Sequence, residues 1–207
     1  MTILPFPTLS RTPSGAAFRL RGNTQTHRSP FDGTTQTLEQ PGARWEITVR
    51  WDSLPEPDHR TLGAFLARLR GQARRFTFPV SIFAPRRGTA AGWPVFLTAP
   101  ASGETFTTNG WTPSSGTGQV AGDWLSYTDT SGRVRLHMAV TDASVDGAGE
   151  CSHTITPPIR RAGTIGQPVE FAAPVGVFML AEDASPDTEI RPPRLGAVTL
   201  SFVEALV

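Results

Sequence analysis

Glycine and proline limit what this chain can fold into more than any other feature of its sequence. There are 20 glycines and 19 prolines among the 207 residues, and both types are spread along the whole length. Proline breaks helices and central strands, and glycine marks turns. The sequence therefore excludes a bundle of long helices. It favours many short strands joined by turns, as in a small β-barrel or β-sandwich.

Alternating apolar and polar residues mark the predicted strands. In ARWEITVRW, the clearest case, Trp45, Ile47, Val49 and Trp51 fall on one face and polar residues on the other. The segment NTQTHRSPFDG contains an Asp-Gly pair and is predicted to be a turn. The further strand candidates are AFRLR, TTQTLEQ, FTFPVSIF, PVFLTA, ETFTT, DWLSYTD, RVRLHMAVTD, CSHTIT, VEFAAPVGVFML and LGAVTLSFVEAL.

One helix is predicted, over residues 58–71. Pro57 suits a first helical turn, and the carboxylate of Asp58 would meet the positive end of the helix dipole. Gly71 is the expected stop. Apolar residues recur with the helical spacing i, i+3, i+4, i+7, so they should form one buried face. These residues are Leu62, Phe65, Leu66 and Leu69.

Both ends of the chain are expected to form one domain. We predict a mainly β fold, in which residues 1–85 and 165–207 build a split β-barrel with one α-helix. The composition shifts towards Gly, Ser and Thr after the helix region. We therefore expect residues 86–164 to form an inserted small β-barrel or sandwich domain.

The first fifteen residues and the arginines near the helix are candidates for contact with other subunits. Three prolines in the first fifteen residues predict an extended arm that packs or pairs at an edge, and a partner subunit could bury it. The arginines form a local basic patch, which either meets an acidic neighbour or phosphate or is a solvated helix face. The candidate interface residues are Phe6, Leu9, Arg68, Arg74 and Arg75.

Composition excludes several functional classes. The net charge of +1 disfavours a dedicated nucleic-acid-binding protein, and all basic residues are arginine, which excludes a Walker lysine. A single cysteine, Cys151, rules out an internal disulfide framework and a cysteine-based zinc site. No apolar run reaches the length of a membrane span, and the N-terminus lacks the pattern of a secretion signal. We expect a soluble chain without a cofactor.

Cys151 and His153 are the only pair that suggests catalysis. Two residues apart in a strand, they would share one face, as a nucleophile and its base would. The sequence supplies neither an orienting third group nor an oxyanion hole, and the alternative is a small core cysteine. His27, His59 and His137 lack metal-ligand spacing, and no G-x-S-x-G elbow occurs. We expect no enzymatic activity.

The segment TDASVDGAGE partly matches a calcium-binding loop. Asp142, Ser144, Asp146 and Gly147 occupy its first, third, fifth and sixth positions. The twelfth position is a histidine instead of the usual glutamate, and strands are expected on both sides. A Gly-rich turn between two strands is the alternative reading. The weak candidate calcium ligands are Asp142, Ser144, Asp146 and Glu150.

Four aromatic residues of the predicted insert could form a stacking surface for sugars. Aromatic side chains are common in β-domains and mostly serve the core, which is the alternative. The four residues are Trp93, Trp111, Trp124 and Tyr127.

The order of features along most of the chain resembles that of the distal tail proteins of long-tailed phages. The resemblance rests on SPFDGTTQTLEQPGARWEITV, on LGAFLARLRGQARRFTFPV, on AGDWLSY followed by LHMAVTDASVDGAGECSHTITPPIR, and on the terminal FMLAEDA and TLSFVEAL. The larger members carry a long C-terminal receptor-binding extension, which this chain is expected to lack, so direct host adhesion is not expected. None of these segments is a catalytic signature.

This resemblance implies a structural role in the virion. Such proteins form a ring, here expected to have six subunits, that joins the tail tube to the tip or baseplate hub around the DNA channel. The implied partners are the tail tube protein, the tape measure and the tail-tip hub proteins, in a phage or a gene transfer agent. The ring would be made in the host cytoplasm and located at the tail tip, without membrane or sequence-specific nucleic-acid binding. The alternative is a carbohydrate-binding β-module at the host-facing tip.

Overall fold

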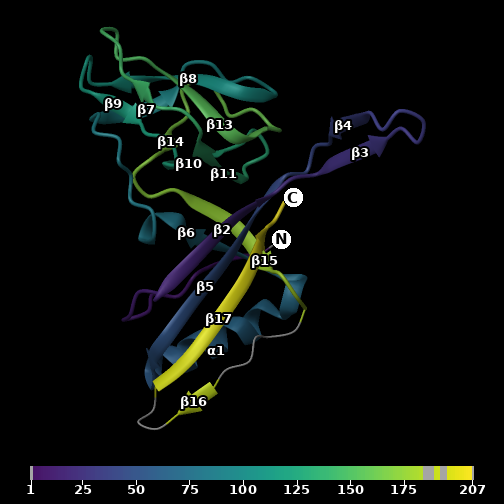
Figure 1. The fold of residues 1–207 in the computed structure, drawn as a ribbon. Coiled ribbons are helices and arrows are strands. Elements are labelled where there is room, and N and C mark those ends of the chain that lie inside the picture. Colours follow the sequence, from purple (N-terminus) through teal and green to yellow (C-terminus); the bar gives the residue numbers. More distant parts are fainter. Residues whose placement is uncertain (1, 184–188, 192–194, 207) are drawn as a thin grey trace.

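The computed structural model of the chain describes residues 2–183, 189–191 and 195–206. These residues form two large β-sheets, two two-stranded sheets and a single long helix. The two large sheets are stacked one above the other (Figure 1), and helix α1 (Glu56–Leu69) packs against the lower one. α1 is the one α-helix in the described residues. No helix in this part of the chain is long and apolar enough to cross a lipid bilayer.

The first sheet combines both ends of the chain. Its strand order is β1-β6-β15-β17-β5-β2, with β16 attached to β17. Every pairing in it is antiparallel except the parallel pair β1–β6. The strands are β1 (Ile3–Pro5), β2 (Gly15–Arg21), β5 (Arg44–Pro55), β6 (Arg75–Pro79), β15 (Val175–Leu180), β16 (Glu189–Arg191) and β17 (Leu195–Glu204).

The second sheet is formed by the intervening residues and is a nearly closed barrel. Its order is β14-β10-β11-β13-β8-β7, and its two edges meet where Val95 bridges Pro168. Its strands are β7 (Gly92–Phe96), β8 (Gly103–Trp111), β10 (Trp124–Thr128), β11 (Val134–Ala139), β13 (Cys151–Ile159) and β14 (Val169–Glu170), beside the short pair β9 (Thr117–Gln119) and β12 (Ala143–Ser144). The mainly β fold class, with one helix and an inserted β-barrel, is confirmed.

Alternation along β5 builds the core of the first sheet. Trp45, Ile47, Val49 and Trp51 are each at most 3% exposed, as their spacing predicts. A fully buried side chain of this size contributes about 1.5 to 3 kcal/mol. The four side chains therefore supply much of the free energy that holds β5 between its neighbours β2 and β17.

Helix α1 covers this core with the predicted face. Leu62, Phe65, Leu66 and Leu69 are all buried, which confirms the periodicity argument. The helix ends at Leu69, two residues before the expected glycine, because Arg70 adopts the left-handed conformation with φ 52°.

The N-terminal arm packs on its own chain. Residues of β1 pair with β6, which confirms the expected edge pairing. The Phe6 ring lies 5.0 Å from the Phe78 ring and 5.4 Å from the Phe65 ring. The arm therefore packs on its own chain without a partner subunit, because β6 supplies its backbone hydrogen bonds and an aromatic cluster takes up Phe6.

The two sheets share a hydrophobic layer. The ring of Trp124, from β10, lies 4.5 Å from that of Trp45 and 5.2 Å from that of Phe18. Leu136, from β11, belongs to the same core cluster. The insert is therefore joined to the first sheet through packed side chains as well as through its two connecting segments.

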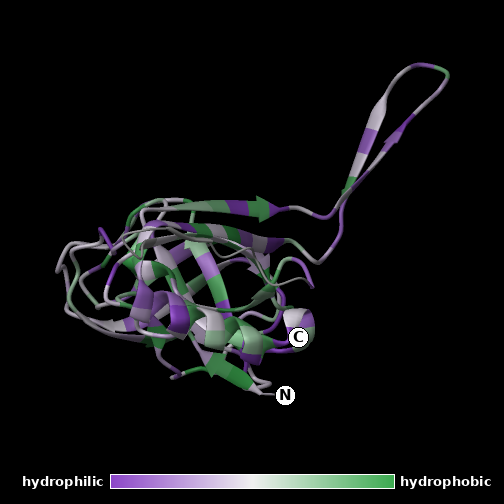
Figure 2. Ribbon diagram, turned by 90° about the horizontal axis from the view of Figure 1, so that it is seen from below, coloured by the Kyte–Doolittle hydropathy of each residue, from purple (hydrophilic) through white to green (hydrophobic). Residues whose placement is uncertain are grey.

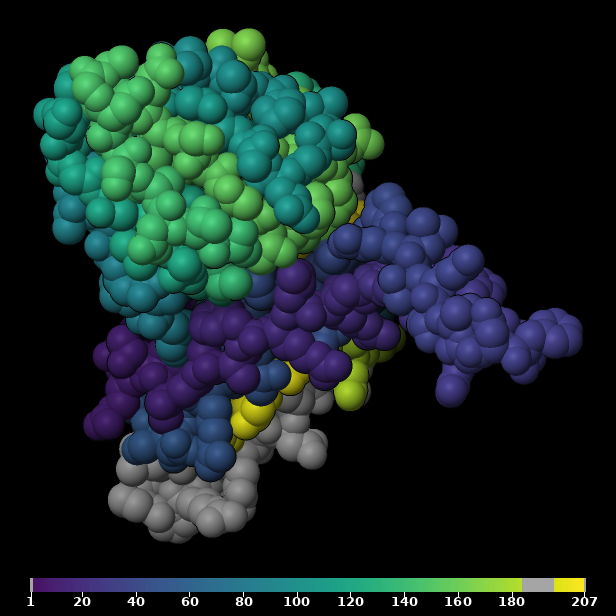
Figure 3. Space-filling view, turned by 45° about the horizontal axis from the view of Figure 1, so that its top comes forward, coloured from purple at the N-terminus to yellow at the C-terminus, as the bar shows by residue number. Residues whose placement is uncertain are grey.

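One hairpin leaves the body of the molecule. Strand β3 (Thr24–Arg28) pairs with β4 (Thr35–Glu39), and the pair continues beyond β2 and β5. Figure 2 shows it extending away from the rest of the protein, and the space-filling view of Figure 3 shows the same separation. β3 lies in the segment predicted to be only a turn.

Candidate assembly surfaces and the predicted sites

Cys151 and His153 share one face of β13, as predicted, but both are buried, with 2% and 0% of their surface exposed. The His153 ring is held on both sides: its Nδ1 lies 2.8 Å from Gln119 Oε1 and its Nε2 2.7 Å from Thr108 Oγ1. Because a carbonyl oxygen only accepts, Nδ1 is the donor and Nε2 accepts from the Thr108 hydroxyl.

Burial sets the protonation of both groups. It lowers the pKa of His153 to about 3, with a smaller contribution from the charge of Arg86. It also raises the pKa of Cys151 to about 11, a change to which the charge of Asp146 adds. At neutral pH the thiol is protonated and the imidazole is neutral with both nitrogens occupied. These states are the opposite of an activated thiolate.

The candidate calcium loop uses its carboxylates to form a turn. The Asp146 Oδ1 atom accepts hydrogen bonds from the backbone N–H groups of Ala148, at 2.9 Å, and Glu150, at 2.8 Å. Asp142 Oδ1 accepts one from the N–H of Ala121 at 2.7 Å. In the described residues, no three His, Cys, Asp or Glu side chains are placed together to hold a metal ion. The arrangement fits the Gly-rich turn that was the alternative reading.

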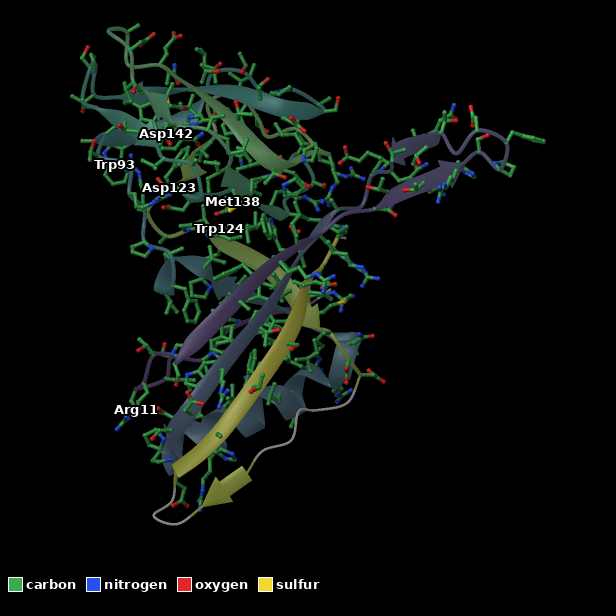
Figure 4. The ribbon with its side chains drawn as sticks, in the orientation of Figure 1. Arg11, Trp93, Asp123, Trp124, Met138 and Asp142 are labelled. Atoms are coloured by element: carbon green, nitrogen blue, oxygen red, sulfur yellow. The ribbon has the colours of Figure 1, made fainter. Side chains whose placement is uncertain are left out.

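The four candidate stacking aromatics do not form one surface. Trp111, Trp124 and Tyr127 are at most 4% exposed, so they serve the core, which was the alternative. Trp93 alone is exposed, with 90% of its surface accessible on strand β7. Figure 4 labels Trp93 and Trp124 and shows the second of them at the junction between the two sheets.

The arginines after α1 bind carbonyl oxygens of their own chain. Arg74 Nη1 donates to the backbone oxygen of Arg68 at 2.9 Å, and Arg75 Nη1 donates to that of Gln72 at 2.5 Å. Cations stabilise the last turn of a helix, where carbonyl groups lack partners. Arg68 is exposed on the helix surface. A neighbouring subunit that binds Arg74 or Arg75 would therefore compete with these hydrogen bonds inside the chain.

Phe6 and Leu9 line a surface pocket of about 200 Å³ at one side of the first sheet. The arm forms one wall, and the second wall comes from the sheet and from the short helix η2 (Val80–Ile82). The apolar lining residues that matter here are Phe6, Leu9, Pro13, Trp51, Phe78 and Ile82.

The β3–β4 hairpin is exposed along its whole length. All ten of its strand residues are exposed. At its base, the N–H of Gln40 donates to the oxygen of Asn23 at 2.7 Å, and Asn23 Nδ2 donates to the oxygen of Pro41 at 2.9 Å. These bonds hold together the base of the hairpin, where the chain leaves β2 and enters β5. The hairpin therefore continues the β2–β5 pair but does not pack into the core of the first sheet.

The tip of the hairpin is an ordered turn. The N–H of Ser29 donates to the oxygen of Thr34 at 2.8 Å. Asp32 Oδ1 accepts from the Thr34 N–H at 3.1 Å and from its hydroxyl at 2.8 Å. Hydrogen bonds from Ser29 and Thr34 lower the pKa of Asp32. Phe31 stands on this turn with 98% of its surface exposed.

Sequence reasoning missed the hairpin although a signal was present. An Asp-Gly pair between two short Thr-rich segments is a hairpin signature. The strand candidate TTQTLEQ contains β4, so only β3 and its pairing with β4 were missed. The segment TQTHR lacks an apolar face, and the alternation that identified the clearest strand was therefore absent there.

The first sheet also has an open edge. In the described residues β2 pairs with β5 on one side and with no strand on the other. Such an edge presents unpaired N–H and C=O groups to another chain.

Neither protein-family models nor curated proteins gave a match to this sequence.

Proposed function

We propose that this chain is a structural subunit of a phage-type tail tip, which forms a ring joining the tail tube to the tip or baseplate around the DNA channel. The observation that carries the proposal is the β3–β4 hairpin, whose ten strand residues are all exposed. A lone two-stranded hairpin is at best marginally stable in water. A neighbouring subunit that covers it would supply the missing stabilisation.

The open edge of β2 supports the same proposal. A neighbouring strand can complete its backbone hydrogen bonds, which is a common way for β-proteins to associate. The order of sequence motifs, which resembles that of distal tail proteins, supplies the setting. On this basis the partners are further copies of the chain, six in the ring, together with the tail tube, tape measure and hub proteins. The location is the virion tail tip.

The protonation of Cys151 and His153 supports a non-enzymatic role. A protonated, buried thiol beside a neutral, fully hydrogen-bonded imidazole is a packing arrangement. The proposal involves no cofactor and no sequence-specific nucleic-acid contact, in keeping with the near-zero net charge.

Electron microscopy and native mass spectrometry of the purified chain test the proposal. We expect a ring of defined copy number, and labelled antibodies should mark one end of tail particles from the source. The matched control replaces residues 24–39 with an Asn-Gly turn, because the hydrogen bond between Gln40 and Asn23 already holds these ends together. This variant should fold and remain monomeric. A wild-type chain that stays monomeric at high concentration and is absent from tails would refute the proposal.

Trp93 favours one second candidate, a carbohydrate-binding module at the host-facing tip. A tryptophan with 90% of its surface exposed offers a stacking face for a sugar ring. Glycan-array binding that Trp93→Ala abolishes would support this function. An array without signal, or a signal that survives the substitution, would exclude it.

A further inference from the structure

The pocket beside the N-terminal arm has the size and lining to hold an aromatic ring. A cavity of ~150 Å³ with aliphatic and aromatic walls takes up benzene. The pocket here measures about 200 Å³ and is lined by the arm, Trp51, Phe78 and Ile82. Ile82 is 46% exposed at its rim, so a ligand would remove further apolar surface from water.

The hairpin presents a ring of that size in a fixed position. The turn from Ser29 to Thr34 is closed by backbone and Asp32 hydrogen bonds, so little order has to be gained on binding. An exposed phenylalanine at the end of a projecting, preordered element is a typical anchor for a pocket. No side chain of its own hairpin covers Phe31 in the described structure, where 98% of its surface is exposed.

We infer that Phe31 of one copy of the chain inserts into the pocket between Phe6, Leu9 and Ile82 of the next copy. This inference rests on the proposed function, and it names the contact that links neighbouring subunits. Charge favours the same orientation, because Asp32 accompanies Phe31 at the tip while Arg11 belongs to the pocket lining.

The positions of the two parts require a second copy. Figure 4 labels Arg11 at the side of the first sheet that lies away from the hairpin, so Phe31 cannot reach the pocket of its own chain. A tip and a pocket on opposite sides give a head-to-tail contact. Repetition of such a contact closes into a ring when its rotation divides a full turn, whereas a two-fold dimer would need one self-complementary patch.

A complementation experiment with two variants tests the inference. Phe31→Ala removes the tip and keeps the pocket, and Ile82→Glu places a charge at the pocket rim and keeps the tip. Phe31 is 98% exposed and Ile82 lies at the surface with 46% of its area exposed, so both variants should fold as the wild type does. Leu38→Ala, at a 58% exposed position on the same hairpin, is the control. Each protein is studied at equal concentration by sedimentation velocity and native mass spectrometry.

We expect wild type and Leu38→Ala to form the ring and each interface variant to be monomeric. An equimolar mixture of the two variants should give a heterodimer, because only one complementary tip and pocket remain. Rings formed by Phe31→Ala would overturn this contact while leaving the proposed ring function intact. A mixture that stays monomeric would also overturn it. A wild type that is monomeric would overturn the contact, and if it is also absent from tails it would overturn the proposed function as well.

Discussion

Acid should destabilise this protein through two buried histidines of the second sheet. His137 is 4% and His153 0% exposed. Burial lowers the pKa of His137 to about 4 and that of His153 to about 3. An unfolded histidine has a pKa of ~6.5. Below that value the unfolded chain binds protons that the folded chain rejects, so the stabilisation is complete above pH ~6.5 and is lost as the pH falls.

The magnitude follows from the same values. A difference of one between the pKa of a group in the folded state and its pKa in the unfolded state is worth ~1.36 kcal/mol. The total effect is then about 3 kcal/mol for His137 and about 5 kcal/mol for His153. As the pH falls from ~6 to ~4.5, both histidines together should lower the free energy of unfolding by about 2 to 3 kcal/mol per pH unit.

Urea unfolding followed by tryptophan fluorescence at several pH values measures this slope. The double variant His137→Gln/His153→Gln should lose most of it, and His27→Gln, on the exposed hairpin, is the matched control. Burial raises the pKa of Glu204, so the folded chain binds a proton there more readily than the unfolded chain does. Protonation of Glu204 therefore stabilises the protein as the pH falls, which opposes the effect of the histidines. The difference in slope between the double variant and the parent protein isolates the contribution of the two histidines. Equal slopes in the parent and the double variant would refute the reasoning.

Three substitutions test the packing by denaturant unfolding at neutral pH. Leu66→Ala should cost about 2 to 5 kcal/mol, the range for a large-to-small change in a core, and a loss below ~1 kcal/mol would contradict the packing of α1. Gly71→Ala should cost about 1 to 3 kcal/mol, because φ is +62° at this position and a Cβ atom would lie 2.5 Å from the backbone oxygen of Asp183. An unchanged denaturant midpoint of unfolding would contradict this prediction. Asp129→Asn should cost about 3 to 5 kcal/mol, because it breaks a buried ion pair with Arg135. In this pair Arg135 Nη2 lies 2.7 Å from Asp129 Oδ2, and the Asp129 side chain is 0% exposed. A cost near zero would show that the pair is solvated.

The sequence alone determined the elements whose pattern is local. Alternation fixed the buried face of Trp45, Ile47, Val49 and Trp51, and helical spacing fixed the face of α1 that includes Leu66. In both cases the period of the backbone decides which side chains share a face. The density of glycine and proline likewise predicted a mainly β fold.

Only the tertiary structure decided what covers each face and which polar groups become partners. Trp124 lies in the layer between the two sheets, and Phe6 packs against the core of its own chain, because strands distant in sequence meet there. Arg74 binds a helix carbonyl, and His153 binds Thr108 and Gln119, through contacts that no spacing encodes. Periodicity gives the direction of a side chain relative to its own strand or helix, whereas its neighbours depend on how those elements pack.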